Sequence, residues 1–159
     1  MDIYKPVYKT DLTVEDRKKA LASLMFITEK RNGDIKARKV ADGSKQHTYN
    51  GYDKADGSSP TISTDIFFLT GLIDAYELQA IAILDIANAF LHAENDEKML
   101  MLLRGKLAEM MVQVDPAMYR KYVTYSPNVQ AMLYVRLSKA SYGILRAALL
   151  FSKSLLNLL

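Results

Sequence analysis

The sequence predicts an α+β domain in which a mixed or antiparallel sheet is packed by helices. Two observations support this class. Half of the 159 residues are hydrophobic and a quarter are charged, which is enough for one domain with a substantial core. Short apolar runs typical of strands are also interspersed with longer segments of helical period, an order that fits an α+β or an α/β domain.

The first 60 residues contain an expected helix, a hairpin and a loop. Thr13-Val14-Glu15-Asp16 has the form of a capping box, which predicts a helix over 14–24 after an irregular lead-in. The Asn-Gly pair in Arg31-Asn32-Gly33-Asp34 tolerates positive φ, so residues 25–41 are expected to form a β-hairpin with a basic face. Residues 42–60 are rich in Gly, Ser, Asp and Asn, and predict a loop.

Beyond residue 60, helical patterns alternate with apolar runs. Ser63 or Thr64 is expected to cap a helix that runs to about Gln79. The Ile-rich run Ala80–Ile86 predicts a buried strand, with Asp85 near its carboxyl end. The further elements expected are strands over 99–103 and 132–137, short helices over 106–112 and 116–123, a turn over 125–131, and a mostly helical segment over 138–159.

Composition excludes several kinds of site. The chain has no cysteine, so disulfides and thiolate metal sites are excluded. Its two histidines, His47 and His92, are too few and too far apart to predict a zinc site. The amino terminus lacks the apolar run of a signal peptide, and the apolar segments 66–84 and 147–159 are too polar or too short to span a membrane. We therefore expect an intracellular protein with no membrane partner.

Charge is unevenly distributed along the chain. The net charge is +3, and the segment up to Gln46 contains 11 Lys and Arg against 7 Asp and Glu. A basic segment suits phosphate groups or nucleic acid. An ordinary solvated surface explains the same charges without a ligand, and charge alone favours that simpler interpretation.

Asp85 is the residue that the apolar pattern singles out. A carboxylate inside a buried strand is costly unless it is paired or bound to a metal ion. At the carboxyl end of a strand it would face a crevice, where binding sites tend to lie. The alternative is an aspartate that faces water or caps the next turn.

Four segments add longer patterns to this single aspartate. They are Ile35-Lys36-Ala37-Arg38-Lys39-Val40-Ala41-Asp42-Gly43, Ser59-Pro60-Thr61, Leu84-Asp85-Ile86-Ala87-Asn88-Ala89-Phe90-Leu91, and Leu133-Tyr134-Val135-Arg136-Leu137-Ser138-Lys139-Ala140-Ser141-Tyr142-Gly143. In this order and at these distances they resemble segments of copia-type retrotransposon reverse transcriptases. The resemblance covers residues 22–159, and it implies the polymerase-like fingers and part of the palm of an RNA-directed DNA polymerase.

The resemblance implies roles for five residues of the third segment. Asp85 and the backbone carbonyl of Ile86 would ligate Mg²⁺, which prefers oxygen ligands. The backbone N–H groups of Asn88 and Ala89 would face the incoming phosphates. Phe90 would lie under the sugar and select deoxynucleotides, because its ring leaves no room for a 2′-hydroxyl. Plain core packing is the alternative for Phe90.

The resemblance also implies contacts with the substrates, which in the family are an RNA or DNA template–primer and deoxynucleoside triphosphates. Arg38 would grip the triphosphate, and Lys36, with Lys30 and Arg31, would neutralise phosphates of nucleotide or template. The alternative is a solvated basic hairpin. Tyr142-Gly143 would lie close to the template–primer and the nucleotide. The intact family acts in the cytoplasm or in a virus-like particle.

The sequence departs from the family in two places. Ile144–Leu149 stands where many members have Lys-Gln-Ala-Pro-Arg, and no Tyr-x-Asp-Asp motif follows, although its aspartates complete the family's metal site. We therefore expect a truncated chain that is inactive alone, with a lead-in and helix over 1–24 and the fingers and partial palm over 25–159. The apolar tail 147–159 is expected to be exposed and to drive self-association.

Two other interpretations remain open. One is a non-catalytic nucleic-acid-binding or interaction module that retains the palm fold. The other is an unrelated α+β domain in which the four similar segments are coincidental.

Overall fold

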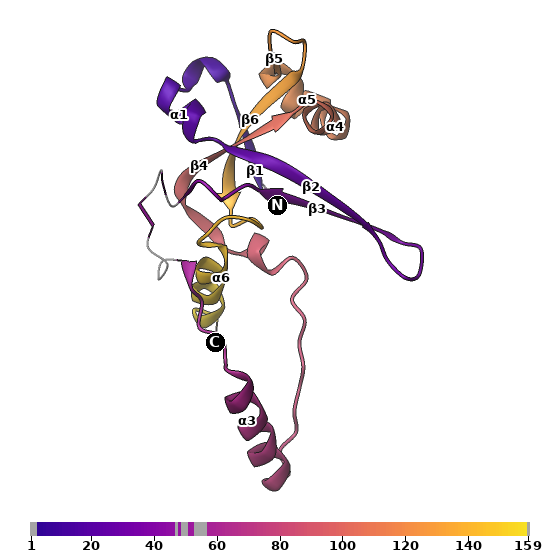
Figure 1. The fold of residues 1–159 in the computed structure, drawn as a ribbon, viewed down its shortest axis with the longest axis vertical. Helices are drawn as coiled ribbons and strands as arrows, with labels where there is room; N and C mark the ends of the chain where they lie inside the picture. Colours follow the sequence, from indigo (N-terminus) through magenta and orange to yellow (C-terminus); the bar gives the residue numbers. More distant parts are fainter. Residues whose placement is uncertain (1–2, 47, 49–50, 53–56, 159) are drawn as a thin grey trace.

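The computed structural model describes residues 3–46, 48, 51–52 and 57–158. They form a mixed α+β structure with a six-stranded sheet (Figure 1). The strands are β1 Tyr4–Val7, β2 Leu21–Glu29, β3 Ile35–Ala41, β4 Glu94–Arg104, β5 Thr124–Tyr125 and β6 Ala131–Lys139. The α-helices are α1 Val14–Lys19, α3 Thr64–Tyr76, α4 Lys106–Val114, α5 Pro116–Tyr119 and α6 Ala147–Leu156, and the 3₁₀ helices are η1 Lys9–Asp11, η3 Ala89–His92 and η4 Arg120–Tyr122. The predicted α+β class is confirmed.

The sheet has the strand order β1-β6-β4-β2-β3, with β5 also paired to β6. Antiparallel pairs join β1 to β6, β6 to β4, and β2 to β3. The parallel pair between β2 and β4 is short, because only Leu21 and Ala22 lie opposite Met101 and Leu102. Beyond these residues β2 separates from β4, and the β2–β3 hairpin extends away from the body of the sheet (Figure 1).

The centre of the sheet is buried on both faces. Met99, Met101 and Leu103 of β4 enter the larger apolar cluster, which α4, α5 and α6 complete with Ala108, Tyr119 and Leu150 among others. The intervening residues Leu100 and Leu102 pack on the other face, with Leu12 and Tyr134. Because side chains alternate along a strand, this two-sided burial explains why residues 99–103 are apolar without interruption.

The predicted helix and hairpin near the amino terminus are confirmed, with changed bounds. Thr13 caps α1 through a reciprocal capping box with Asp16. The helix ends at Lys19 because Leu21 and Ala22 pair with β4 instead of continuing the helix. The expected boundary between residues 24 and 25 falls inside β2. The lead-in also contains β1, a strand that the sequence did not predict and that pairs with β6.

Most predicted elements of the second half are present. Of the two residues expected to cap α3, Ser63 is the one that does so. The strand expected over 99–103 begins earlier, at Glu94, and β6 continues to Lys139. The helical tail therefore begins only at Ala147. Its first turns are buried through Ala147 and Leu150, whereas Leu156 and Leu158 are exposed.

The buried strand predicted over Ala80–Ile86 is wrong. The segment has no strand pairing, and its apolar side chains are exposed, with 94% of Ile83 and 88% of Leu84 accessible to solvent. The physical reason is that an apolar run becomes a buried strand only where a neighbouring strand receives its backbone groups. Here α3 and the segment that follows it extend away from the sheet (Figure 1). The expected position of Asp85 at the end of a central strand is therefore also wrong.

Among the helices that the structure describes, none combines the length and the apolar character required to cross a membrane.

Candidate functional site

The candidate site lies where the end of β3 meets the turn that follows β6. The Ala41 backbone N–H donates to the carbonyl oxygen of Tyr142 at 2.8 Å, and the Asp42 N–H donates to the carbonyl of Ala22 at 2.8 Å. The first bond ties the segment expected to form the fingers to Tyr142-Gly143. Two of the four segments singled out by sequence are therefore in direct contact.

Glycine is required on both sides of this contact. Gly143 has a φ of +89°, and a Cβ atom on it would lie 1.9 Å from the carbonyl oxygen of Ala41. A Cβ atom on Gly43 would lie 2.1 Å from the carbonyl oxygen of Gly143. Both distances are far below van der Waals contact, so the two glycines allow an approach of backbones that no other residue permits.

Phe90 joins the same contact from the third segment. Its ring centroid lies 4.9 Å from that of Tyr142, with a tilt of 59° between the ring planes, and 6.2 Å from that of Phe151. Asn88 positions the ring by adopting the left-handed conformation, with φ 54° and ψ 38°, immediately before η3. Ala89 is the first residue of η3. Phe90 is half-buried, so part of it packs in the core and part remains accessible.

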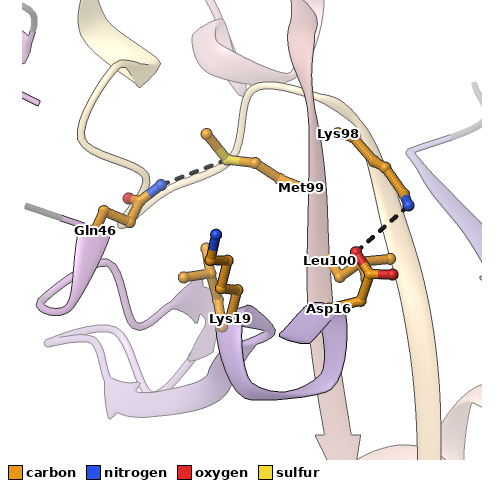
Figure 2. Close-up of a pocket in the computed structure, with 7 residues that line it drawn as sticks. Asp16, Lys19, Gln46, Lys98, Met99 and Leu100 are labelled. Atoms are coloured by element: carbon orange, nitrogen blue, oxygen red, sulfur yellow. Dashed lines mark hydrogen bonds and ion pairs between the residues drawn. The ribbon is translucent and has the colours of Figure 1, made fainter. Parts of the chain in front are cut away.

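Gln46 is a residue of this region that sequence reasoning missed. Its side chain is 2% exposed, and its Oε1 accepts the backbone N–H of Leu145 at 2.9 Å. Its Nε2 lies 3.4 Å from the sulfur of Met99 (Figure 2). Gln46 thus holds the turn after Tyr142-Gly143 against β4. A glutamine in a polar loop has no periodic neighbours, so the sequence carries no signal of its burial.

Arg146 is the single basic residue in the stretch that departs from the resembling family. Its guanidinium forms an ion pair with Asp96, with 3.1 Å between Nη2 and Oδ2, and a second ion pair with Glu97. Burial disfavours the charged form, but the hydrogen bond with Glu97 and the charges of both carboxylates raise the pKa of Arg146 above its ordinary value. Arg146 therefore holds the start of α6 against β4.

Two cations of β3 have no acidic partner among the described residues. Lys36 lies opposite Thr28 and Arg38 lies opposite Phe26, so the two cations share one face of β3. Both are exposed, and neither forms an ion pair with any residue that the structure describes.

Arg31 in the turn is likewise exposed and forms no ion pair with the described residues, whereas Lys30 and Lys39 differ. Lys30 forms an ion pair of 3.7 Å with Asp34 in the turn. Lys39 points from the opposite face, with its Nζ 3.5 Å from the centroid of the Tyr4 ring, and burial lowers its pKa to about 8.

Asp85 and Ile86 are not part of this assembly of contacts. Asp85 is exposed on the irregular segment after α3, and its side chain makes no hydrogen bond or ion pair with the described residues. Within the described ranges, no three His, Asp or Glu side chains come together as metal ligands. One carboxylate with one carbonyl supplies too few oxygens for Mg²⁺, so these residues by themselves do not make the expected metal site.

Comparison of the chain with known protein families, with curated proteins and with solved structures finds no match.

Proposed function

We propose that the chain forms the fingers and part of the palm of a copia-type reverse transcriptase, an RNA-directed DNA polymerase. One observation supports this proposal above the others. Ala41, Phe90 and Tyr142 belong to three separate segments that resemble this family. The carbonyl of Tyr142 accepts a hydrogen bond from the Ala41 N–H, and its ring packs against that of Phe90. A coincidental resemblance gives no reason for the three segments to meet.

The contacts suit a nucleotide site on chemical grounds. Phe90 offers a half-buried aromatic surface for a sugar, with the half-buried ring of Tyr142 packed beside it and Gly143 exposed next in the chain. Lys36 and Arg38 supply unpaired positive charge on the hairpin that leads into the same contact. Arginine binds phosphate oxygens through two parallel hydrogen bonds, so Arg38 is suited to a triphosphate.

The metal-binding part of this proposal depends on a second segment. In the intact family, Mg²⁺ ions stabilise the attacking and leaving oxygens of nucleotidyl transfer. Asp85 and the Ile86 carbonyl would supply ligands, and the aspartates of a Tyr-x-Asp-Asp motif would supply the others. The printed sequence contains no such motif. We therefore expect no nucleotide incorporation by the 159 residues alone.

The decisive experiment restores the motif. The chain would be fused to the downstream palm segment of a copia-type reverse transcriptase that carries Tyr-x-Asp-Asp, and primer extension would be measured on an RNA template with Mg²⁺. We expect deoxynucleotide incorporation by the fusion protein and none by the chain alone. Asp85→Asn in the fusion should abolish incorporation, because it removes a charged metal ligand.

Asp65→Asn is the matched control, because it makes the same chemical change at an exposed position in the first turn of α3. It should leave incorporation intact. A well-folded fusion that does not extend primers, or one that extends them equally well with Asp85→Asn, would refute the catalytic proposal.

The second candidate is a non-catalytic nucleic-acid-binding module that retains the same fold. Two observations favour it: Lys36 and Arg38 lie on the hairpin without an ion pair to any described residue, and Asp85 lies on an exposed segment outside any described group of three or more potential metal ligands. Salt-dependent binding of an oligonucleotide by a fusion protein that does not extend primers would establish this function instead.

A further inference from the structure

A second concentration of positive charge lies away from the hairpin, in the space that opens where β2 separates from β4. It is a hollow of about 480 Å³. Its charged lining consists of five cations and one carboxylate, namely Arg17, Lys18, Lys19, Lys45, Arg104 and Asp42. No motif of the sequence singled out this set, because its members come from α1, from the loop after β3 and from the end of β4.

Two hydrogen bonds to backbone carbonyls hold the elements around the hollow. The Ser23 hydroxyl donates to the carbonyl of Leu102 at 3.1 Å, which fixes β2 beside β4 at the point of separation. The Asp42 N–H donates to the carbonyl of Ala22 at 2.8 Å, which holds the loop carrying Lys45 over the same point. Neither bond involves a side chain of the cations that line the hollow, so substitution of those cations leaves both bonds in place.

α1 is fixed in place, so its three cations are held near the hollow. The Thr13–Asp16 capping box begins the helix, and Lys98 of β4 lies 3.4 Å from Asp16 (Figure 2). Lys19 also lines a smaller adjoining hollow of about 80 Å³, into which its ammonium group points in Figure 2. Lys19 thus borders both recesses, whereas Arg17 and Lys18 border the larger one.

Most of this charge is not neutralised by the protein. Lys19 forms an ion pair with Glu15 at 3.4 Å. The pKa of the Asp42 carboxyl is lowered, mainly by hydrogen bonds from Ser44 and to a smaller extent by the charge of Lys45. Lys18, Lys45 and Arg104 are exposed and form no ion pair with the described part of the chain. Like charges around one recess repel each other, and a bound anion relieves that repulsion.

We propose that this hollow binds linked phosphate groups, from the backbone of a nucleic acid strand or from a free polyphosphate chain. Several cations around an open recess match a ligand that carries a charge on each repeating unit, and arginine and lysine are the residues that bind phosphate oxygens. The proposal goes beyond the polymerase proposal, since it involves neither Asp85 nor the contact of Phe90 with Tyr142.

The test uses the full chain and a fluorescently labelled oligothymidylate, with binding measured by anisotropy over a series of salt concentrations. The hollow variant is Lys18→Gln/Lys45→Gln/Arg104→Gln, which removes three exposed charges without breaking an ion pair. The matched control is Lys5→Gln/Lys121→Gln/Lys153→Gln, which removes three exposed charges elsewhere, again without breaking an ion pair among the described residues.

We expect the hollow variant to bind at least about tenfold more weakly, with a salt slope shallower by about 2, and the control to change far less. Footprinting of the parent protein by lysine acylation gives a second measurement that needs no variant. Lys18 and Lys45 should be protected by the oligonucleotide, whereas Lys106 should not. Equal weakening of both variants, absence of protection, or no binding by the parent would each overturn the proposal.

Competition by sodium tripolyphosphate distinguishes the two sources of phosphate. Displacement of the oligonucleotide from the parent at a matched phosphate concentration would identify free polyphosphate as a ligand. Failure to displace it would assign the hollow to a nucleic acid backbone. Primer extension by the fusion protein remains a separate readout, so failure of this proposal and failure of the polymerase proposal are distinguishable.

Discussion

Gly143 presses its backbone against the carbonyl of Ala41, at a place where even a methyl group would lie 1.9 Å from the oxygen. Gly143→Ala should therefore force the turn after β6 away from the end of β3, in addition to straining a positive φ. We expect a loss of about 3 kcal/mol or more in the free energy of unfolding, measured by urea titration.

Gly33→Ala is the control for Gly143. Gly33 has a similar φ of +85°, but a Cβ atom on it would meet nothing within 4 Å. Its substitution should cost only the conformational strain, about 1 kcal/mol. Equal losses for the two variants would show that the contact with Ala41 contributes nothing.

Gln46→Met should destabilise the protein by about 1–3 kcal/mol, because it keeps the side-chain volume but leaves the half-buried N–H of Leu145 without its acceptor. Met99→Leu removes only the weak contact with sulfur and should cost less than about 1.5 kcal/mol. Thermal unfolding of the two variants measures both losses of stability. A larger loss for Met99→Leu would contradict the assigned role of the Gln46 carbonyl.

Lys39 gives the stability a dependence on pH. Burial lowers its pKa in the folded protein to about 8, from an ordinary value of 10.5, while the Tyr4 ring beneath the ammonium opposes this shift. Between pH 8 and 10.5 the unfolded chain binds more protons at this lysine than the folded chain does, so the contribution of Lys39 to stability rises with pH there.

Lys39→Met isolates this effect. The free energy of unfolding of the parent, relative to that of Lys39→Met, should increase from pH 8 to pH 10 in urea titrations. The comparison stops at pH 10 because burial raises the pKa of Tyr4, whose contribution is lost at higher pH. A difference that stays constant or falls over this range would contradict the assignment.

Lys36→Glu/Arg38→Glu should weaken binding of single-stranded nucleic acid by at least about tenfold and make the salt slope shallower by about 1.4, as expected for two lost phosphate contacts. The control is Lys9→Glu/Lys121→Glu, which makes the same change of charge on other elements. If the hairpin is only a solvated basic surface, both double variants will show the same affinity.

Self-association should depend more on α3 than on the carboxyl-terminal tail. Leu150 of the tail is buried, whereas α3 and residues 81–84 border an exposed apolar hollow of about 740 Å³. Phe68→Lys/Leu84→Lys should therefore reduce association, measured by light scattering, more than Leu156→Lys/Leu158→Lys does. A greater effect of the tail variant would instead support the expectation from the sequence that the tail drives self-association.

Features that depend on neighbours in sequence were predicted well. The Thr13–Asp16 capping box and the Asn32-Gly33 turn are set by residues within one turn of each other, and both are present. The predicted bounds fail where a distant strand decides the outcome. Residues 80–86 and 99–103 are similarly apolar, but only the second segment lies between two other strands.

The candidate site was predictable in part for the same reason. The resemblance singled out Phe90 and Tyr142, and the structure brings their rings together. Gln46 and Arg146 are held by contacts with β4, more than 45 residues away in sequence, and no local pattern predicts such contacts. The predicted metal-binding role of Asp85 stays a prediction, because it depends on ligands that the described residues do not provide.

The position of β6 between β1 and β4 determines when these two strands can join the sheet during synthesis. β1 and β4 both pair with β6, which follows both of them in the sequence. Until residues 131–139 leave the ribosome, both earlier strands retain an open edge that can pair with other chains. The β2–β3 hairpin has local contacts and can form long before this point. Folding of the nascent protein should therefore begin with the hairpin, and the emergence of β6 should then cover the edges of β1 and β4 that pair with it.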